Sequence, residues 1–167
     1  MNARRWAPAV LLALAGCAGV APPPGDRLSG RLSVRVADDA ARSFNAAFEL
    51  VGSAERGSLA LSTPLGVQVA QADWSAQQVR LRSSDGERVY ADLDSLAADA
   101  LGERLPLAAL FDWLRGRPWP GASASGTASG FAQLGWSVDL SRQAEGWIEA
   151  QRAAPPAVTL RAKLDRP

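Results

Sequence analysis

Side chains able to carry catalysis or to bind metals are scarce in this 167-residue sequence. Histidine is absent, and Cys17 is the single cysteine. These counts exclude a Ser-His-Asp triad, a Cys-His pair, an intramolecular disulfide and a zinc site built on imidazole or thiolate ligands. We therefore expect a protein that is not an enzyme, with no catalytic residue, no metal and no cofactor. The position of Cys17 in the chain indicates that its thiol is modified instead.

Cys17 follows an apolar run near the N-terminus. Arg4 and Arg5 precede the run, and its residues 6–16 are too few to cross a bilayer as a helix. Leu14-Ala15-Gly16 followed by cysteine resembles a bacterial lipobox, in which the thiol receives diacylglycerol and the freed amine a third acyl chain. An ordinary cleaved signal with a chance cysteine is the alternative. We favour lipidation because the only cysteine stands at the expected end of the run.

Lipidation would divide the chain into three parts. Residues 1–16 form a signal peptide, residues 17–27 a lipidated cysteine with a proline-rich tether, and residues 28–167 a single domain. Two acyl chains suffice for stable anchoring, so the mature protein is expected to be tethered to a membrane. Alanine rather than aspartate at position 18 favours the outer membrane. With 18 basic and 17 acidic residues, the charge predicts no nucleic-acid partner.

The spacing of apolar residues predicts the elements of the domain. Alternation between residues 28 and 90 indicates six half-buried strands. From Leu93 to Leu101 and from Leu107 to Leu114 the apolar residues recur at helical spacing, which predicts two short amphipathic helices. The segment 117–121 is irregular, residues 122–130 are small and flexible in composition, and four or five strands follow. The order predicts one mainly β domain, an antiparallel sheet with a helical insert.

Several candidate sites have simpler structural explanations. The pair Asp38-Asp39 favours a turn, and Asp92 with Asp94 favours a helix start, over an acid-base dyad. The Gly-x-x-x-Gly stretch from Gly126 to Gly130 lacks the Lys-Ser/Thr of a phosphate loop. Four tryptophans could bind an aromatic ligand, although core packing is the commoner explanation; they are Trp74, Trp113, Trp136 and Trp147.

One loop has an unexpected residue at its tip. In Thr63-Pro64-Leu65-Gly66, proline and glycine make the turn, and a leucine stands where a polar residue is usual. The leucine either folds back onto the core, or is one of the single exposed leucines found on most surfaces, or has a function at the tip. The residues alone leave these alternatives open.

Motifs that resemble one known family occur in order along nearly the whole mature chain. They are the lipobox, Phe44-x-x-x-Phe48, Leu59-x-Leu61-Ser62-Thr63-Pro64-Leu65-Gly66, Asp85-Gly86 with Tyr90, Leu105-Pro106-Leu107-x-x-Leu110-x-x-Trp113-Leu114-x-Gly116-x-Pro118, and Gly130-Phe131-x-Gln133-x-Gly135-Trp136-x-Val138. Their order and spacing are similar to those of the LolB family of outer-membrane lipoprotein receptors. Two departures are Leu50, where a tryptophan is frequent, and the end of the chain, which lacks the usual final tryptophan.

The resemblance implies a fold and a function. The fold is an incomplete antiparallel β-barrel of about eleven strands, capped by short helices around an apolar cavity, as in LolA and LolB. The function is to accept triacylated lipoproteins from a periplasmic carrier (LolA) and to insert them into the inner leaflet of the outer membrane. The implied partners are the carrier, the acyl chains of the cargo and outer-membrane lipid, and we expect a monomer at the periplasmic face.

The resemblance also assigns candidate site residues. Leu65 corresponds to a protruding loop leucine that acts in membrane insertion, so Pro64, Leu65 and Gly66 are the expected insertion loop. The apolar faces of the two helices are either a lid over the cavity or ordinary core; the residues concerned are Leu96, Leu101, Leu107, Leu110, Phe111 and Leu114.

Two other functions compete with this prediction. A membrane-anchored periplasmic binding protein for a free lipid or another hydrophobic ligand would share the cavity but would not need the carrier. A structural lipoprotein would have a solid core, and periodicity does not distinguish a solid core from a cavity.

Overall fold

The computed structural model describes residues 27–101 and 105–165, without the side chain of Leu101. The expected signal peptide, Cys17 and all of the tether except Arg27 lie outside these residues. The division of the chain at residues 16 and 27 therefore stays a prediction.

Six strands, two helices and five further strands follow one another within the described residues, as the spacing of apolar residues predicts. The first part comprises β1 (Arg27–Val36), β2 (Asp39–Gly52), β3 (Gly57–Ser62), β4 (Gln68–Trp74), β5 (Val79–Ser83) and β6 (Gly86–Tyr90). The insert comprises α1 (Leu93–Leu101) and α2 (Leu107–Trp113). The last part comprises β7 (Ala124–Gly126), β8 (Gly130–Gln133), β9 (Trp136–Asp139), a 3-10 turn (Gln143–Glu145), β10 (Trp147–Arg152) and β11 (Val158–Leu164).

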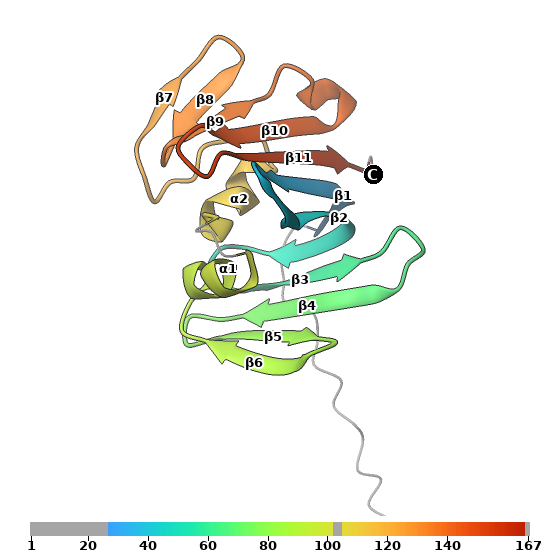
Figure 1. The fold of residues 1–167 in the computed structure, drawn as a ribbon. Helices are drawn as coiled ribbons and strands as arrows, with labels where there is room; N and C mark the ends of the chain where they lie inside the picture. Colours follow the sequence, from blue (N-terminus) through green and yellow to red (C-terminus); the bar gives the residue numbers. More distant parts are fainter. Residues whose placement is uncertain (1–26, 102–104, 166–167) are drawn as a thin grey trace, which may run out of the picture.

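The strands form a single antiparallel sheet that does not close. Their order is β6-β5-β4-β3-β2-β1-β11-β10-β9-β8-β7, so β6 and β7 are the two edges. Figure 1 shows the sheet curving around the two helices, with α1 beside the β3 to β6 half. The predicted incomplete antiparallel barrel with a helical insert is confirmed.

Alternation assigns one face of each strand to the interior. On β1, Leu32, Val34 and Val36 are buried, whereas Arg31 and Arg35 on the opposite face are exposed. Val34 pairs with Phe44 on one side and with Leu160 on the other, so the same inward face continues across three strands. A side-chain period of two therefore places a continuous apolar surface inside the barrel.

Short polar contacts define where the first helix begins. The backbone N–H of Ser95 donates to Asp92 Oδ1 at 2.7 Å, which caps the free amides of α1. Asp94 lies in the first turn, where a negative charge interacts favourably with the helix dipole. Asp38 lies in the turn between β1 and β2. Both aspartate pairs thus have the structural positions that the sequence favours.

The β8–β9 half of the barrel is tightly packed. Trp113 of α2 contacts Phe131 and Trp136 with ring centroids 6.4 and 5.9 Å apart. Gln133, 2% exposed, accepts hydrogen bonds from Trp113 Nε1 at 2.8 Å and from the Trp119 backbone N–H at 2.9 Å. Its Nε2 donates to the carbonyls of Trp119 and Ala122. Because each polar atom of this buried amide has a partner, it holds the irregular 117–122 segment against the sheet.

Candidate functional site: an apolar cavity and an exposed loop

The other half of the barrel contains a cavity. Its volume is about 390 Å³, within the usual range for small-molecule sites. Inward side chains of the sheet form one wall and residues of α1 and α2 form the other. The lining residues are Leu32, Val34, Phe44, Leu59, Leu61, Ala70, Ala72, Leu81, Ser83, Asp85, Arg88, Leu96, Asp99, Ala100, Leu105, Leu107, Leu110 and Leu160.

A smaller pocket of about 40 Å³ adjoins the cavity. Six residues line both spaces: Leu32, Leu59, Ala72, Leu96, Leu107 and Leu110. All lining residues of the smaller pocket are apolar, and Trp74 and Phe111 meet there with ring centroids 5.0 Å apart. The interior therefore continues from a space of ligand size into an apolar end.

A polar cluster joins α1 to the edge strand β6 beside the cavity. Asp99 Oδ2 accepts hydrogen bonds from Tyr90 Oη at 2.5 Å and from Arg88 Nη1 at 2.9 Å. These bonds, the one from Tyr90 first, lower the pKa of Asp99 from its ordinary 3.8. The bond to Asp99 raises the pKa of Tyr90. The side chains of the ion pair are exposed, so its contribution to the free energy of unfolding is small.

We predict that this cluster holds α1 against β6 only while Asp99 is ionised. Because the pKa of Asp99 is lowered in the folded state, its stabilisation is present above about pH 4 and is lost as the pH falls through the lowered value. Asp99→Asn should therefore reduce hydrogen-exchange protection of the α1 amides at pH 7. The difference from the wild type should shrink as the pH falls below about 4 and Asp99 becomes protonated. Asp38→Asn, in the β1–β2 turn, is the control, and an equal loss there would contradict the assignment.

The loop between β3 and β4 is held by its own hydrogen bonds. The Gly66 N–H donates to the Thr63 carbonyl at 2.9 Å, the Thr63 N–H to the Val67 carbonyl at 2.8 Å, and the Val67 N–H to Thr63 Oγ1 at 3.2 Å. Gly66 adopts a φ of +83°, which favours glycine, and Pro64 occupies the second turn position. Leu65 is thus presented at the tip of a defined turn.

Leu65 is 93% exposed, so it does not fold back onto the core. Val67 and Val69 follow it and are 63% and 45% exposed. Among the described residues five large apolar side chains are this exposed, and three of them belong to this hairpin. Figure 1 shows the hairpin extending beyond the neighbouring β5–β6 turn. The alternative of a single exposed leucine does not account for this grouping.

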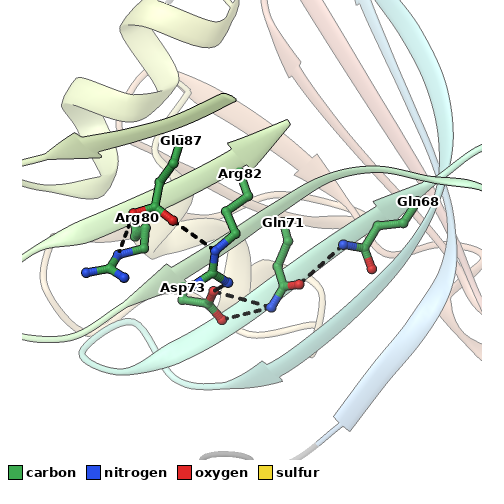
Figure 2. Close-up of polar contacts among 6 residues, drawn as sticks. All are labelled: Gln68, Gln71, Asp73, Arg80, Arg82 and Glu87. Carbon is green, nitrogen blue, oxygen red and sulfur yellow. Dashed lines mark hydrogen bonds and ion pairs between the residues drawn. The ribbon is translucent and has the colours of Figure 1, made fainter. Parts of the chain in front are cut away.

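The outer face of β4, β5 and β6 is polar (Figure 2). Arg82 bridges Asp73 at 3.0 Å and Glu87 at 3.1 Å, and Glu87 also contacts Arg80 at 3.4 Å. Gln71 donates to Asp73 and accepts from Gln68, which brings the network to the start of the exposed hairpin. Each exposed pair contributes less than about 1 kcal/mol. The network therefore keeps this face hydrated, with Val89 as its exposed apolar residue, while Leu65, Val67 and Val69 are grouped at the hairpin.

The predicted site residues separate into two places. Leu96, Leu107 and Leu110 line the main cavity, and Phe111 and Leu114 line the smaller pocket. Pro64, Leu65 and Gly66 are exposed at the hairpin. Cys17 and the side chain of Leu101 lie outside the described residues. The helix residues are both core and cavity wall, so the two interpretations of their apolar faces are not exclusive.

One group of residues escaped the sequence reasoning: Ser83, Asp85, Arg88 and Asp99 line the cavity although they are polar. The available signal was the alternation along β6, in which Val89 is 56% exposed while Arg88 lines the cavity. Trp74 is buried at the apolar end, as the prediction of core packing expects.

Neither a metal site nor a membrane-spanning helix is found in the described part of the chain. Residues 27–101 and 105–165 contain no group of three or more Asp, Glu, His or Cys side chains that could hold a metal ion. None of the helices in these two ranges is long and apolar enough to cross a bilayer.

The fold and the cavity define an open antiparallel β-barrel protein with an interior apolar space beneath two helices. The family model of the outer membrane lipoprotein LolB matches residues 27–165. The chain therefore belongs to the LolB family of outer membrane lipoproteins of the lipoprotein-sorting pathway, and the predicted resemblance is confirmed.

Individual relatives agree with this membership. The outer-membrane lipoprotein LolB of Bordetella petrii is 32% identical over 172 residues, covering 91% of this chain and 86% of the relative. The protein of the same name from Ralstonia nicotianae is 34% identical, covering 92% and 82% of the two chains. That of Bordetella pertussis is 33% identical, covering 80% and 75%. These relatives support the predicted location at the outer membrane.

Proposed function

We propose that this protein accepts the acyl chains of lipoproteins from a periplasmic carrier of the LolA type and releases them into the inner leaflet of the outer membrane. The observation that carries the proposal is the apolar cavity between the inward faces of β1 to β6 and the two helices. The exposed Leu65 hairpin and the family membership support it.

The energetics of acyl chains require direct transfer. Each methylene exposed to water costs about 0.8 kcal/mol, so exposing three chains would cost tens of kcal/mol. The chains must pass from the carrier's interior to this cavity without entering water. The bilayer is the final acceptor, and differences in affinity are sufficient to give the transfer its direction.

We assign the Leu65 hairpin to release at the membrane. Burying one leucine contributes about 1.5–3 kcal/mol, which is too little to anchor the protein but enough to favour contact of the hairpin with lipid. Leu65, Val67 and Val69 would contact the bilayer together, while the polar outer face of β4 to β6 stays in water. Anchoring is assigned to lipids on Cys17.

The separation of anchoring from acceptance is testable. A Cys17→Ala chain exported with a cleavable signal should accept cargo from the carrier as the wild type does, because the cavity is unchanged. Its release should be less selective for the outer membrane. Transfer of a labelled lipoprotein from carrier to chain, measured by co-purification, checks acceptance, and sedimentation with outer or inner membranes checks selectivity. Failure of Cys17→Ala to take any cargo would contradict the proposal.

A further inference from the structure

The polar residues of the main cavity are gathered at one end. Ser83 ends β5, Asp85 lies in the β5–β6 turn, Arg88 belongs to the edge strand β6, and Asp99 belongs to α1. The side chains of Arg88 and Asp99 are 58% and 47% exposed, so this end reaches solvent. The other lining residues of the cavity are apolar.

The opposite end is apolar and lies deeper. Along β4 and β5, Ser83 pairs with Ala70, and Val79 pairs with Trp74. Trp74 lies four positions along β4 from Ala70, a distance of about 13 Å in a strand. Trp74 lines only the smaller pocket, and the Trp74 side chain is buried. The interior therefore changes from polar and accessible to apolar and enclosed along the strand direction.

The accessible end, which we call the rim, has a definite hydrogen-bonding character. The rim consists of Ser83, Asp85, Arg88 and Asp99. Its carboxylates and hydroxyl accept from N–H or O–H groups, and the guanidinium donates to carbonyl oxygens. Two carboxylates against one guanidinium disfavour an anionic ligand group. A neutral group with both donors and acceptors matches the rim best.

We propose that the cavity binds the amide-linked acyl chain of a lipoprotein in one direction. The terminal methyl group lies beside Trp74, and a neutral polar head that both donates and accepts hydrogen bonds lies at the rim. This inference rests on the proposed function, since it concerns the same acyl chains. An amide-linked chain carries a head of this class, with an N–H that donates and a carbonyl that accepts, whereas an ester only accepts and a free fatty acid carries a carboxylate that the rim disfavours.

Position-dependent quenching by bromine tests the direction. The chain from residue 17 on, with Cys17→Ala, is titrated with hexadecanamide brominated at carbon 2 or at carbon 16. The Trp74 signal is obtained as the difference from Trp74→Phe. A second variant, Ser83→Trp with Trp74 retained, adds tryptophan fluorescence at the rim. This reporter does not require that Trp74→Phe folds.

The proposal expects opposite orders at the two reporters. The 16-bromo amide should quench Trp74 at least twofold more than the 2-bromo amide, and the order should reverse for Ser83→Trp. Equal quenching by the two amides at each reporter, or stronger quenching of Trp74 by the 2-bromo amide, would overturn the proposed direction. Either result would still show that the acyl chain binds. Absence of quenching by both amides at both reporters would overturn the proposed function as well.

The preference for a neutral head has a separate measurement. Hexadecanamide should compete with hexadecanoate at pH 8, and the affinity ratio should favour the amide. In Asp85→Asn, which removes one rim charge, this ratio should fall about threefold or more. An unchanged ratio in Asp85→Asn would overturn the assignment of the head to the rim.

Discussion

Leu65→Glu should leave folding and cargo acceptance intact and should reduce delivery to the membrane about tenfold or more. Leu65 is 93% exposed, so the substitution removes no core contact. It removes about 1.5–3 kcal/mol of possible lipid contact at the tip, which corresponds to at least a tenfold effect, and adds a charge that must stay hydrated. The measurement counts labelled lipoprotein bound to the variant and labelled lipoprotein appearing in the membrane.

Leu134→Glu is the matched control for this prediction. Leu134 is also an exposed leucine at a hairpin tip, between β8 and β9, and is 46% exposed. Delivery by Leu134→Glu should equal that of the wild type. Unimpaired delivery by Leu65→Glu, or equal losses in the two variants, would contradict a specific role for the β3–β4 hairpin.

Ala72→Phe should block acyl binding without unfolding the domain. Ala72 is buried and lines both the cavity and the smaller pocket, between Leu59 and Leu81 on the neighbouring strands. The added ring enters existing empty space, so the usual cost of overpacking should be small. Excluding two methylenes of ligand costs about 1.6 kcal/mol, or roughly a 15-fold loss of affinity. Titration with a fluorescent acyl probe measures this loss.

Ala47→Phe makes the same substitution outside the cavity. Ala47 lies on β2 next to Phe48, and its side chain is absent from the cavity wall. Acyl affinity should be unchanged in Ala47→Phe, and urea unfolding should report the stability of both variants. Equal affinity of Ala72→Phe and the wild type would mean that the acyl chains bind elsewhere.

The architecture followed from periodicity because most elements have one buried face. Leu32, Val34 and Val36 alternate with arginine and serine, and Asp92 caps the start of α1. The strand β7 was missed because Ala124–Gly126 has only small residues and forms a strand only by pairing with β8. Tertiary pairing, not local preference, determines such an edge strand.

The cavity could not be predicted from the alternation because a period of two reports which face is buried, not how well it is filled. Ala70 and Ala72 are inward residues of β4 and leave space opposite the helices. In the other half Trp113, Phe131 and Trp136 fill the corresponding volume. Whether the inward side chains fill the barrel or leave a cavity depends on the curvature of the sheet and on the position of the helices.

Delivery of a lipoprotein from carrier to membrane tests the central claim most directly. A LolA-type carrier loaded with one radiolabelled lipoprotein is mixed with outer membranes depleted of their own receptor, with and without this protein. We predict that label moves to the membrane only when the protein is present. If label stays on a competent carrier despite the protein, the account of a receptor is wrong, and a membrane-anchored binding protein for free lipid becomes the better description.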